Sequence, residues 1–199
     1  MEQEHEGCTA NYLDYAVGYA AVWDDPDLYL ALLAHLLSPR LEPAKSWGTD
    51  RMRVTTRGGH HWLDQAWKKY EADLDAFAPM VFSVAEAALL KHLNLEERVE
   101  ITLLGFNRRR SAIQPHEQDR HRDPIDAAID IVRDTAVALW RIDTDGVERI
   151  IERWLASKHT LMRRIAVHVV SQTPNATGSD LVRFVNQTCK EWSLPHGVK

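Results

Sequence analysis

Apolar residues at helical spacing dominate the C-terminal third of the chain, residues 124–192. One stripe, spaced i, i+3, i+4, i+7 and i+8, consists of Val147, Ile150, Ile151, Trp154 and Leu155. A similar stripe consists of Leu181, Phe184, Val185, Thr188 and Trp192. Because such short helices are marginal alone in water, each stripe must pack against a neighbour. The pattern therefore predicts four consecutive amphipathic helices in stacked hairpins.

Residues 124–142 form the first of these predicted helices. Asp123 and Pro124 provide a capping residue and a first-turn proline. The polar side chains fall within an arc of roughly 100°, so we expect the helix to be covered on two sides.

A capping pattern predicts the start of the second helix, and a proline predicts the end of the third. Asp145 and Glu148 have the spacing of a capping box, and Pro174 ends a helix over 160–173. Ser179 is expected to cap the last helix. We expect one core to contain Ile151, Trp154, Leu161, Ile165, Val169, Phe184 and Trp192.

The N-terminal part, 1–38, reads as a helical pair over 11–23 and 25–38. Asp25 and Pro26 begin the second helix, and Ser38 before Pro39 ends it. Residues 39–61 are predicted to be a loop rich in proline and glycine, with a short strand at 51–56 as the alternative.

Residues 62–199 are predicted to be a helical-array domain, or part of one domain with the rest of the chain. Its first half contains a helix over 62–77, a helix from Pro79 to about Leu93, and a segment, 95–106, that fits a helix better than a strand. We expect no sheet larger than a two-stranded ribbon near 51–56 or 99–104. The predicted fold is all-α, a HEAT-like α-solenoid or stacked helical hairpins.

Composition narrows the class of protein. The chain has 199 residues, 45% hydrophobic and 27% charged, with a net charge of −5, which argues against a general nucleic-acid binder. Its two cysteines, Cys8 and Cys189, exclude a disulfide scaffold and a cysteine-based zinc site. The acidic start is unlike a signal peptide, and the longest apolar run, 28–37, is too short to span a membrane. We expect a cytoplasmic protein without a membrane segment.

The segment 107–123 is a charged loop with residue types that bind metals. These are His116, Glu117, Asp119, His121 and Asp123. Arginines lie between and upstream of them and would oppose a bound cation, so a solvated or partner-binding loop is favoured over a metal site. Ile113 is the one apolar side chain that could anchor the segment, so we expect residues 107–123 to form an exposed contact loop.

Asp126, Asp130 and Asp134 share one face of the predicted helix 124–142. A catalytic carboxylate pair is one interpretation, because proximity raises one of two neighbouring pKa values. The favoured interpretation is neutralisation of the row by Arg133, Arg141, Arg163 and Arg164.

Two stretches carry a family resemblance: RSAIQPHEQDRHRDPIDAAIDIVRDTAVALW over 110–140 and ERWLASKHTLMRRIAVHVV over 152–170. They resemble a helical segment of large bacterial antiphage-defence proteins, in which a sirtuin-like or STAND-type ATPase domain is joined to a long helical array. RRIAVHVV is also similar to a helix of a HEAT-type repeat. The resemblance implies sensing or scaffolding and transfers no catalytic residue.

The sequence thus predicts a non-enzymatic scaffold or sensor that binds a protein partner, without a cofactor, bound metal or catalytic residue. The expected contact residues are Arg108, Arg109, Arg110, His116, Arg120 and Arg122. One alternative is a metal-dependent, nuclease-like enzyme using His, Asp and Glu around 116–134. A second is nucleic-acid contact through Arg108–Arg110. The pattern leaves the partner and the oligomeric state open.

Overall fold

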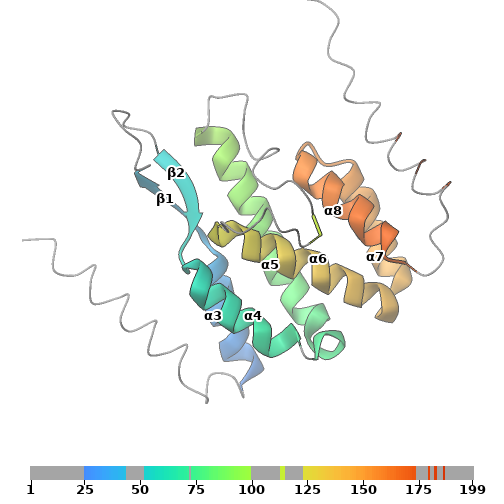
Figure 1. Cartoon of the computed structure of the whole chain (residues 1–199), viewed down its shortest axis with the longest axis horizontal. Helices are drawn as coiled ribbons and strands as arrows, with labels where there is room; N and C mark the ends of the chain where they lie inside the picture. The colour runs from blue at the N-terminus through green and yellow to red at the C-terminus, as the bar shows by residue number, and fades with distance from the viewer. Residues whose placement is uncertain are drawn as a thin grey trace, which may run out of the picture.

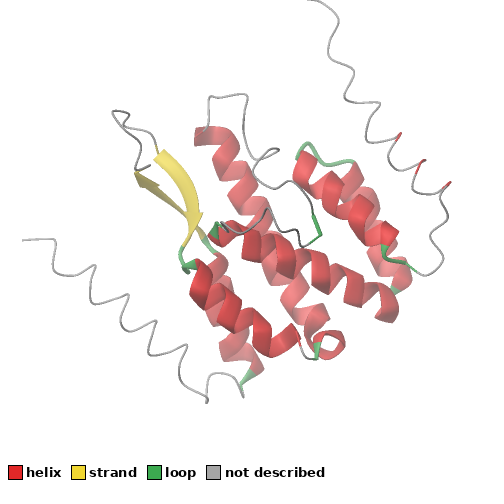
Figure 2. Ribbon diagram, in the orientation of Figure 1, coloured by secondary structure: helices red, strands yellow, loops and turns green. Residues whose placement is uncertain are grey.

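The computed structural model describes residues 25–43, 52–71, 73–99, 113–114, 123–173 and positions 179, 182 and 186. These residues are mostly helical, with one two-stranded ribbon, as Figures 1 and 2 show. The elements are α3 Pro26–Leu37, β1 Pro39–Pro43, β2 Met52–Thr56, α4 His60–Glu71, α5 Leu74–Val99, α6 Pro124–Ile142, α7 Thr144–Leu155 and α8 Thr160–Ser171. The predicted helical character is confirmed, whereas the HEAT-like arrangement stays a prediction.

Helix α6 lies at the centre of the described structure. It packs against α4, α5, α7 and α8 and also contacts β2 (Figure 1). Small residues such as Ala128 and Ala136 are buried together with larger ones such as Ile129 and Ile131, which allows helices to approach from several sides. The prediction that this helix is covered on two sides is confirmed.

The predicted C-terminal core is confirmed where the structure describes it. Five of its members are buried in one hydrophobic cluster: Ile151, Trp154, Leu161, Ile165 and Val169. The other two, Phe184 and Trp192, and most of the predicted last helix lie outside the described residues.

The predicted helix boundaries around Pro79 are wrong. Helix α4 ends at Glu71, and α5 runs without a break from Leu74 to Val99 with Pro79 inside it. A proline within a helix removes the hydrogen bond to the carbonyl four residues earlier, here that of Asp75. Since Pro79 and Asp75 are both exposed, solvent can hydrogen-bond this carbonyl. Phe77 therefore belongs to α5.

Helix α5 is also long and apolar enough, by length and composition, to cross a membrane, which the length of uninterrupted apolar runs did not predict. Half of its apolar window is buried inside the protein, and Phe82, Leu89 and Leu93 belong to the core. The core helix of a globular domain has this pattern, so α5 is weak evidence for a membrane span.

The predicted loop 39–61 is wrong in part, because it contains the β1–β2 ribbon and the start of α4. The strands are antiparallel, with Leu41 opposite Val54 and Glu42 opposite Arg53. The alternative of a short strand at 51–56 is confirmed by β2. Val54 and Thr56 are buried, whereas Arg53 before them is exposed and Thr55 between them is partly exposed, the alternation expected of a half-buried strand.

Gly58 positions the ribbon against the end of α3. Its N–H donates to the Leu36 carbonyl at 2.8 Å, and its own carbonyl accepts from the Thr56 hydroxyl at 2.6 Å. A Cβ atom at Gly58 would lie 2.9 Å from Leu36 Cβ. This close approach requires glycine at the junction.

Caps define several helix starts. Asp25 begins α3 as predicted, and Pro124 is the first residue of α6. The predicted start of α7 at Asp145 is wrong, because Asp143 is the capping residue and accepts from the Gly146 N–H at 2.9 Å. Asp143 lies only two residues before Asp145 and is also an aspartate, so residue type alone does not identify the cap.

We expect Asp25→Ala to lower the free energy of unfolding by about 1 kcal/mol, the usual cost of losing an N-cap side chain. The Asp25 carboxylate accepts from the N–H groups of Asp27 at 3.0 Å and Leu28 at 3.1 Å. Denaturant unfolding measures the loss. Asp25→Ser keeps a capping oxygen and should recover most of it; equal stability of both variants and the wild type would contradict the cap.

Candidate functional site

The aspartate row of α6 is divided between two structural roles. At the start of the helix, the Asp126 carboxylate accepts from the backbone N–H of Asp123 at 2.9 Å. One and two turns later, Asp130 and Asp134 both contact Arg133. The row is therefore not a free set of carboxylates.

Arg133 connects these carboxylates to a distant part of the chain. Its Nη1 donates to Asp130 Oδ1 at 2.5 Å, and its Nε and Nη2 donate to the two oxygens of Asp134 at 2.6 and 2.7 Å. Nη1 also donates to the Ile113 carbonyl at 2.8 Å. One guanidinium thus makes four hydrogen bonds, a use of its planar donor geometry that lysine does not reproduce.

Asp130 and Arg133 are buried, and the neighbouring carboxylates favour the charged form of Arg133. Asp130 and Arg133 are only 5% and 6% exposed. Burial acts to lower the pKa of Arg133, but the hydrogen bonds and charges of Asp134 and Asp130 outweigh it and raise that pKa above its ordinary value. Both neighbouring carboxylates are thus held in ion pairs with Arg133 and are not a free carboxylate pair.

The predicted neutralisation of the row is confirmed for Arg133 and wrong for Arg141. Arg141 instead donates to Asp75 of α5 at 3.0 Å. Arg163 donates to the Ser157 carbonyl at 2.9 Å and to the Thr160 hydroxyl at 3.1 Å, in the turn between α7 and α8. The helix period placed these arginines correctly along the chain, but their partners depend on helix packing.

The predicted contact residues lie outside the described part of the structure. These are Arg108, Arg109, Arg110, His116, Arg120 and Arg122, and the same holds for Glu117, Asp119 and His121 of the metal alternative. Ile113, between them in sequence, is described. It is 7% exposed and belongs to the hydrophobic core. The expectation that this segment is exposed is therefore wrong at Ile113.

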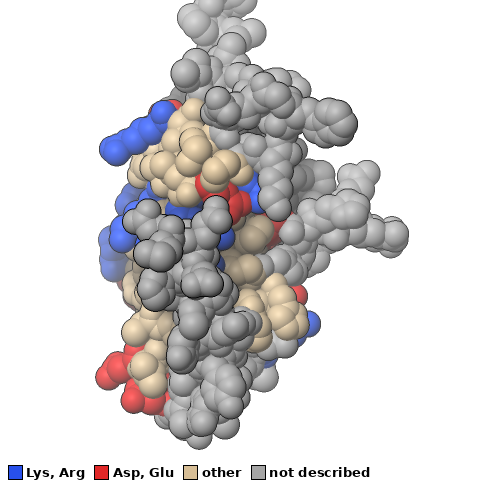
Figure 3. Space-filling view, turned by 90° about the vertical axis from the view of Figure 1, so that its left-hand side faces the viewer, with Lys and Arg blue, Asp and Glu red and all other residues tan. Residues whose placement is uncertain are grey.

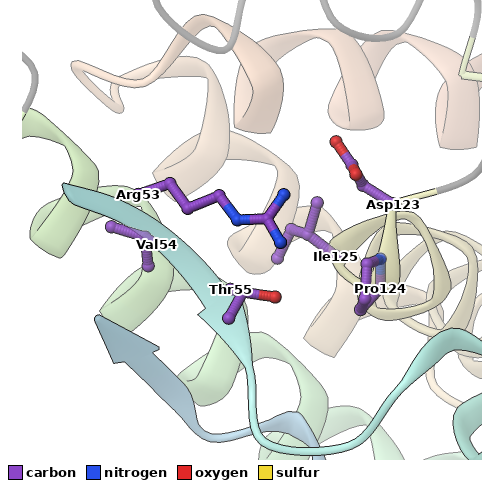
Figure 4. Close-up of a pocket in the computed structure, with 6 residues that line it drawn as sticks. All are labelled: Arg53, Val54, Thr55, Asp123, Pro124 and Ile125. Carbon is purple, nitrogen blue, oxygen red and sulfur yellow. The ribbon is translucent and has the colours of Figure 1, made fainter. Parts of the chain in front are cut away.

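A small pocket lies beside the start of α6. Arg53, Val54 and Thr55 of β2 line one side, and Asp123, Pro124 and Ile125 line the other. In Figure 4 the Arg53 side chain extends from β2 toward this helix end. The space is about 240 Å³ including open solvent, smaller than most ligand pockets, and Arg53 is already hydrogen-bonded to Glu42 at 2.7 Å. The pocket provides little room for a small molecule.

Polar contacts between α5 and the α7–α8 hairpin were not predicted. Glu86 of α5 accepts from Trp154 Nε1 at 2.5 Å and from Arg153 Nη2 at 2.6 Å. His159 Nε2 lies 3.2 Å from Asn94 Oδ1, and burial together with the neighbouring Lys158 charge lowers the pKa of His159. These pairs form only because α5 packs against the α7–α8 hairpin, which is distant from it in sequence. No local sequence pattern indicates such contacts.

Within the described ranges, no three or more His, Cys, Asp or Glu side chains gather closely enough to hold a metal ion. No protein-family model, curated protein or solved structure matches the chain. A function must therefore be inferred from the chemistry of this chain's own residues.

Proposed function

We propose that this protein is a non-enzymatic helical scaffold or sensor module that binds an acidic segment of a partner protein. The contact is made by the loop 107–123, whose proposed contact residues are Arg108, Arg109, Arg110, His116, Arg120 and Arg122. Arginine pairs with carboxylates in two-point geometry and is enriched at protein interfaces.

The observation that carries the proposal is the attachment of Ile113 to α6. Its side chain is buried in the core, and its carbonyl accepts from Arg133 at 2.8 Å. The loop carries five arginines against three acidic residues, so this attachment ties a segment with excess positive charge to the central helix. A rigid helix that holds a charged segment is a suitable scaffold for binding.

The aspartate row supports a structural role over a catalytic one. A general acid or base needs a pKa matched to its task and access to a substrate. Asp130 is buried and held by Arg133, and Asp126 accepts the N–H of Asp123. These carboxylates of the metal-dependent alternative therefore already have structural partners.

Charge supports a protein partner over nucleic acid. The whole chain carries a net charge of −5, whereas a nucleic-acid surface usually needs an extended positive patch. Figure 3 views the side on which the β1–β2 ribbon lies, and both basic and acidic atoms are visible among the described residues. Because the whole chain is acidic, the positive excess of residues 107–123 is local, which suits an acidic peptide segment.

Three further features belong to this proposal. The helices form a HEAT-like stack, the protein acts in bacterial antiphage defence, and it is cytoplasmic. The support is the repeated amphipathic pattern, the resemblance of 110–140 and 152–170, and the low number of cysteines, two in 199 residues, which suits a reducing compartment.

We expect the variant Arg108→Ala/Arg109→Ala/Arg110→Ala to bind a fluorescent oligoglutamate peptide at least about tenfold more weakly than the wild type, a loss of about 1.4 kcal/mol. The unfolding midpoint should barely change. Fluorescence anisotropy at several salt concentrations measures the binding.

The matched control is Arg57→Ala/Lys91→Ala/Arg98→Ala, which removes three exposed positive charges from described elements. It should keep most of the affinity. An equal loss in both variants would indicate only general charge attraction. Tighter binding of a duplex DNA oligonucleotide than of the peptide would support the nucleic-acid alternative instead.

A further inference from the structure

We propose that Arg133 is a positioning residue that fixes Ile113, between the proposed contact residues in sequence, with Asp130 and Asp134 orienting its guanidinium. The inference rests on the proposed function for its consequence in binding, and on the contacts of Arg133 for its mechanism.

The orientation of the guanidinium is determined from two directions. Asp134 holds Nε and Nη2 through both carboxylate oxygens, at 2.6 and 2.7 Å. Asp130 holds Nη1 at 2.5 Å. Since the guanidinium is planar and rigid, these contacts set the direction of the remaining Nη1 hydrogen, which reaches the Ile113 carbonyl at 2.8 Å.

The contact with Ile113 joins residues that are 20 positions apart. A buried hydrogen bond to a charged donor is stronger than one between neutral groups, and the buried Ile113 side chain adds an apolar anchor beside it. The aspartates thus have a use that the acid–base interpretation misses: they aim an arginine at a backbone carbonyl.

Fixing this point affects binding through entropy. Because Ile113 is already held in place, less conformational freedom is lost at this residue when a partner binds, and such preorganisation increases affinity. Residues Arg108–Arg110 precede the fixed point by only three to five positions, and His116 follows it by three.

Arg133→Lys tests the proposal because it keeps the positive charge between the two aspartates but removes the planar fork. We expect this variant, and separately Ile113→Ala, to bind the oligoglutamate peptide about tenfold more weakly. Arg141→Lys on the same helix, whose partner is the exposed Asp75, is the matched control and should bind like the wild type.

A second measurement does not depend on the partner. Hydrogen–deuterium exchange of the peptide that contains Ile113 and Gln114 should be faster in Arg133→Lys and Ile113→Ala than in the wild type or Arg141→Lys. Unchanged exchange in both variants would overturn the proposal, whatever the binding result.

Peptide binding and hydrogen exchange together show whether the positioning role of Arg133 or the proposed function is wrong. If the triple arginine variant loses binding while Arg133→Lys and Ile113→Ala bind normally, the positioning role is wrong and the proposed function stands. If the wild type does not bind the peptide but exchange increases as expected, the positioning of Ile113 stands and the proposed function is wrong.

Discussion

Replacing Trp154 with alanine should lower the free energy of unfolding by about 3–5 kcal/mol, the usual cost of removing a buried large aromatic side chain. Trp154 is 1% exposed, and its ring lies 5.8 Å from that of Phe82 between centroids. Its Nε1 donates to Glu86 at 2.5 Å. The side chain thus joins α7 to α5 through both packing and a hydrogen bond.

Denaturant unfolding of Trp154→Ala and Trp154→Phe separates these two contributions. Phenylalanine keeps most of the ring packing and loses the bond to Glu86, so we expect it to cost less than alanine. A cost below about 1 kcal/mol for alanine would show that the C-terminal hairpin does not depend on this core.

Replacing Arg133 with methionine should cost about 3–5 kcal/mol, because it leaves Asp130 as a buried charge without its cation. Asp134 suffers less, since its side chain is 25% exposed and water can solvate it. Thermal or denaturant unfolding near neutral pH measures the loss.

The double variant Asp130→Leu/Arg133→Met removes both buried charges. Replacing a buried ion pair by apolar residues of similar size is often neutral, so most of the lost stability should return. If the double variant is as unstable as Arg133→Met, the uncompensated charge is not the cause, and packing around the Arg133 side chain determines the loss instead.

Local signals predicted helix α6 and the core around Trp154 well. Asp123 and Pro124 marked the start of α6, and the apolar period of 147–155 and 160–171 marked the buried faces of α7 and α8. These features depend on residues within two or three turns of one another, which a sequence displays directly.

The candidate site was predicted only in its α6 half. The spacing of Asp126, Asp130 and Asp134 placed three carboxylates on one helix face, and Arg133 was recognised as a neutralising charge. The link from Arg133 to the Ile113 carbonyl was not predicted. No side-chain pattern indicates a hydrogen bond to a backbone carbonyl 20 residues away.

Pro79 shows where a local rule fails. The rule that proline begins a helix predicted a break, but α5 continues through Pro79 from Leu74. The packing of this helix against α6 and α3 stabilises it as one continuous helix. The backbone N–H that proline lacks would lie on the exposed side of the helix.

Within the described part of the chain, the sequence by itself determined most of the helical segments, where several of them begin, and which faces are buried, because helix periodicity and capping act over short distances. Tertiary structure alone decided the partners: Arg141 with Asp75, Trp154 and Arg153 with Glu86, Arg133 with Ile113, and β1 with β2. Burial of apolar faces brings the residues of these pairs together. Because the hydrophobic effect is non-directional, the packing of the whole domain determines which residues become neighbours.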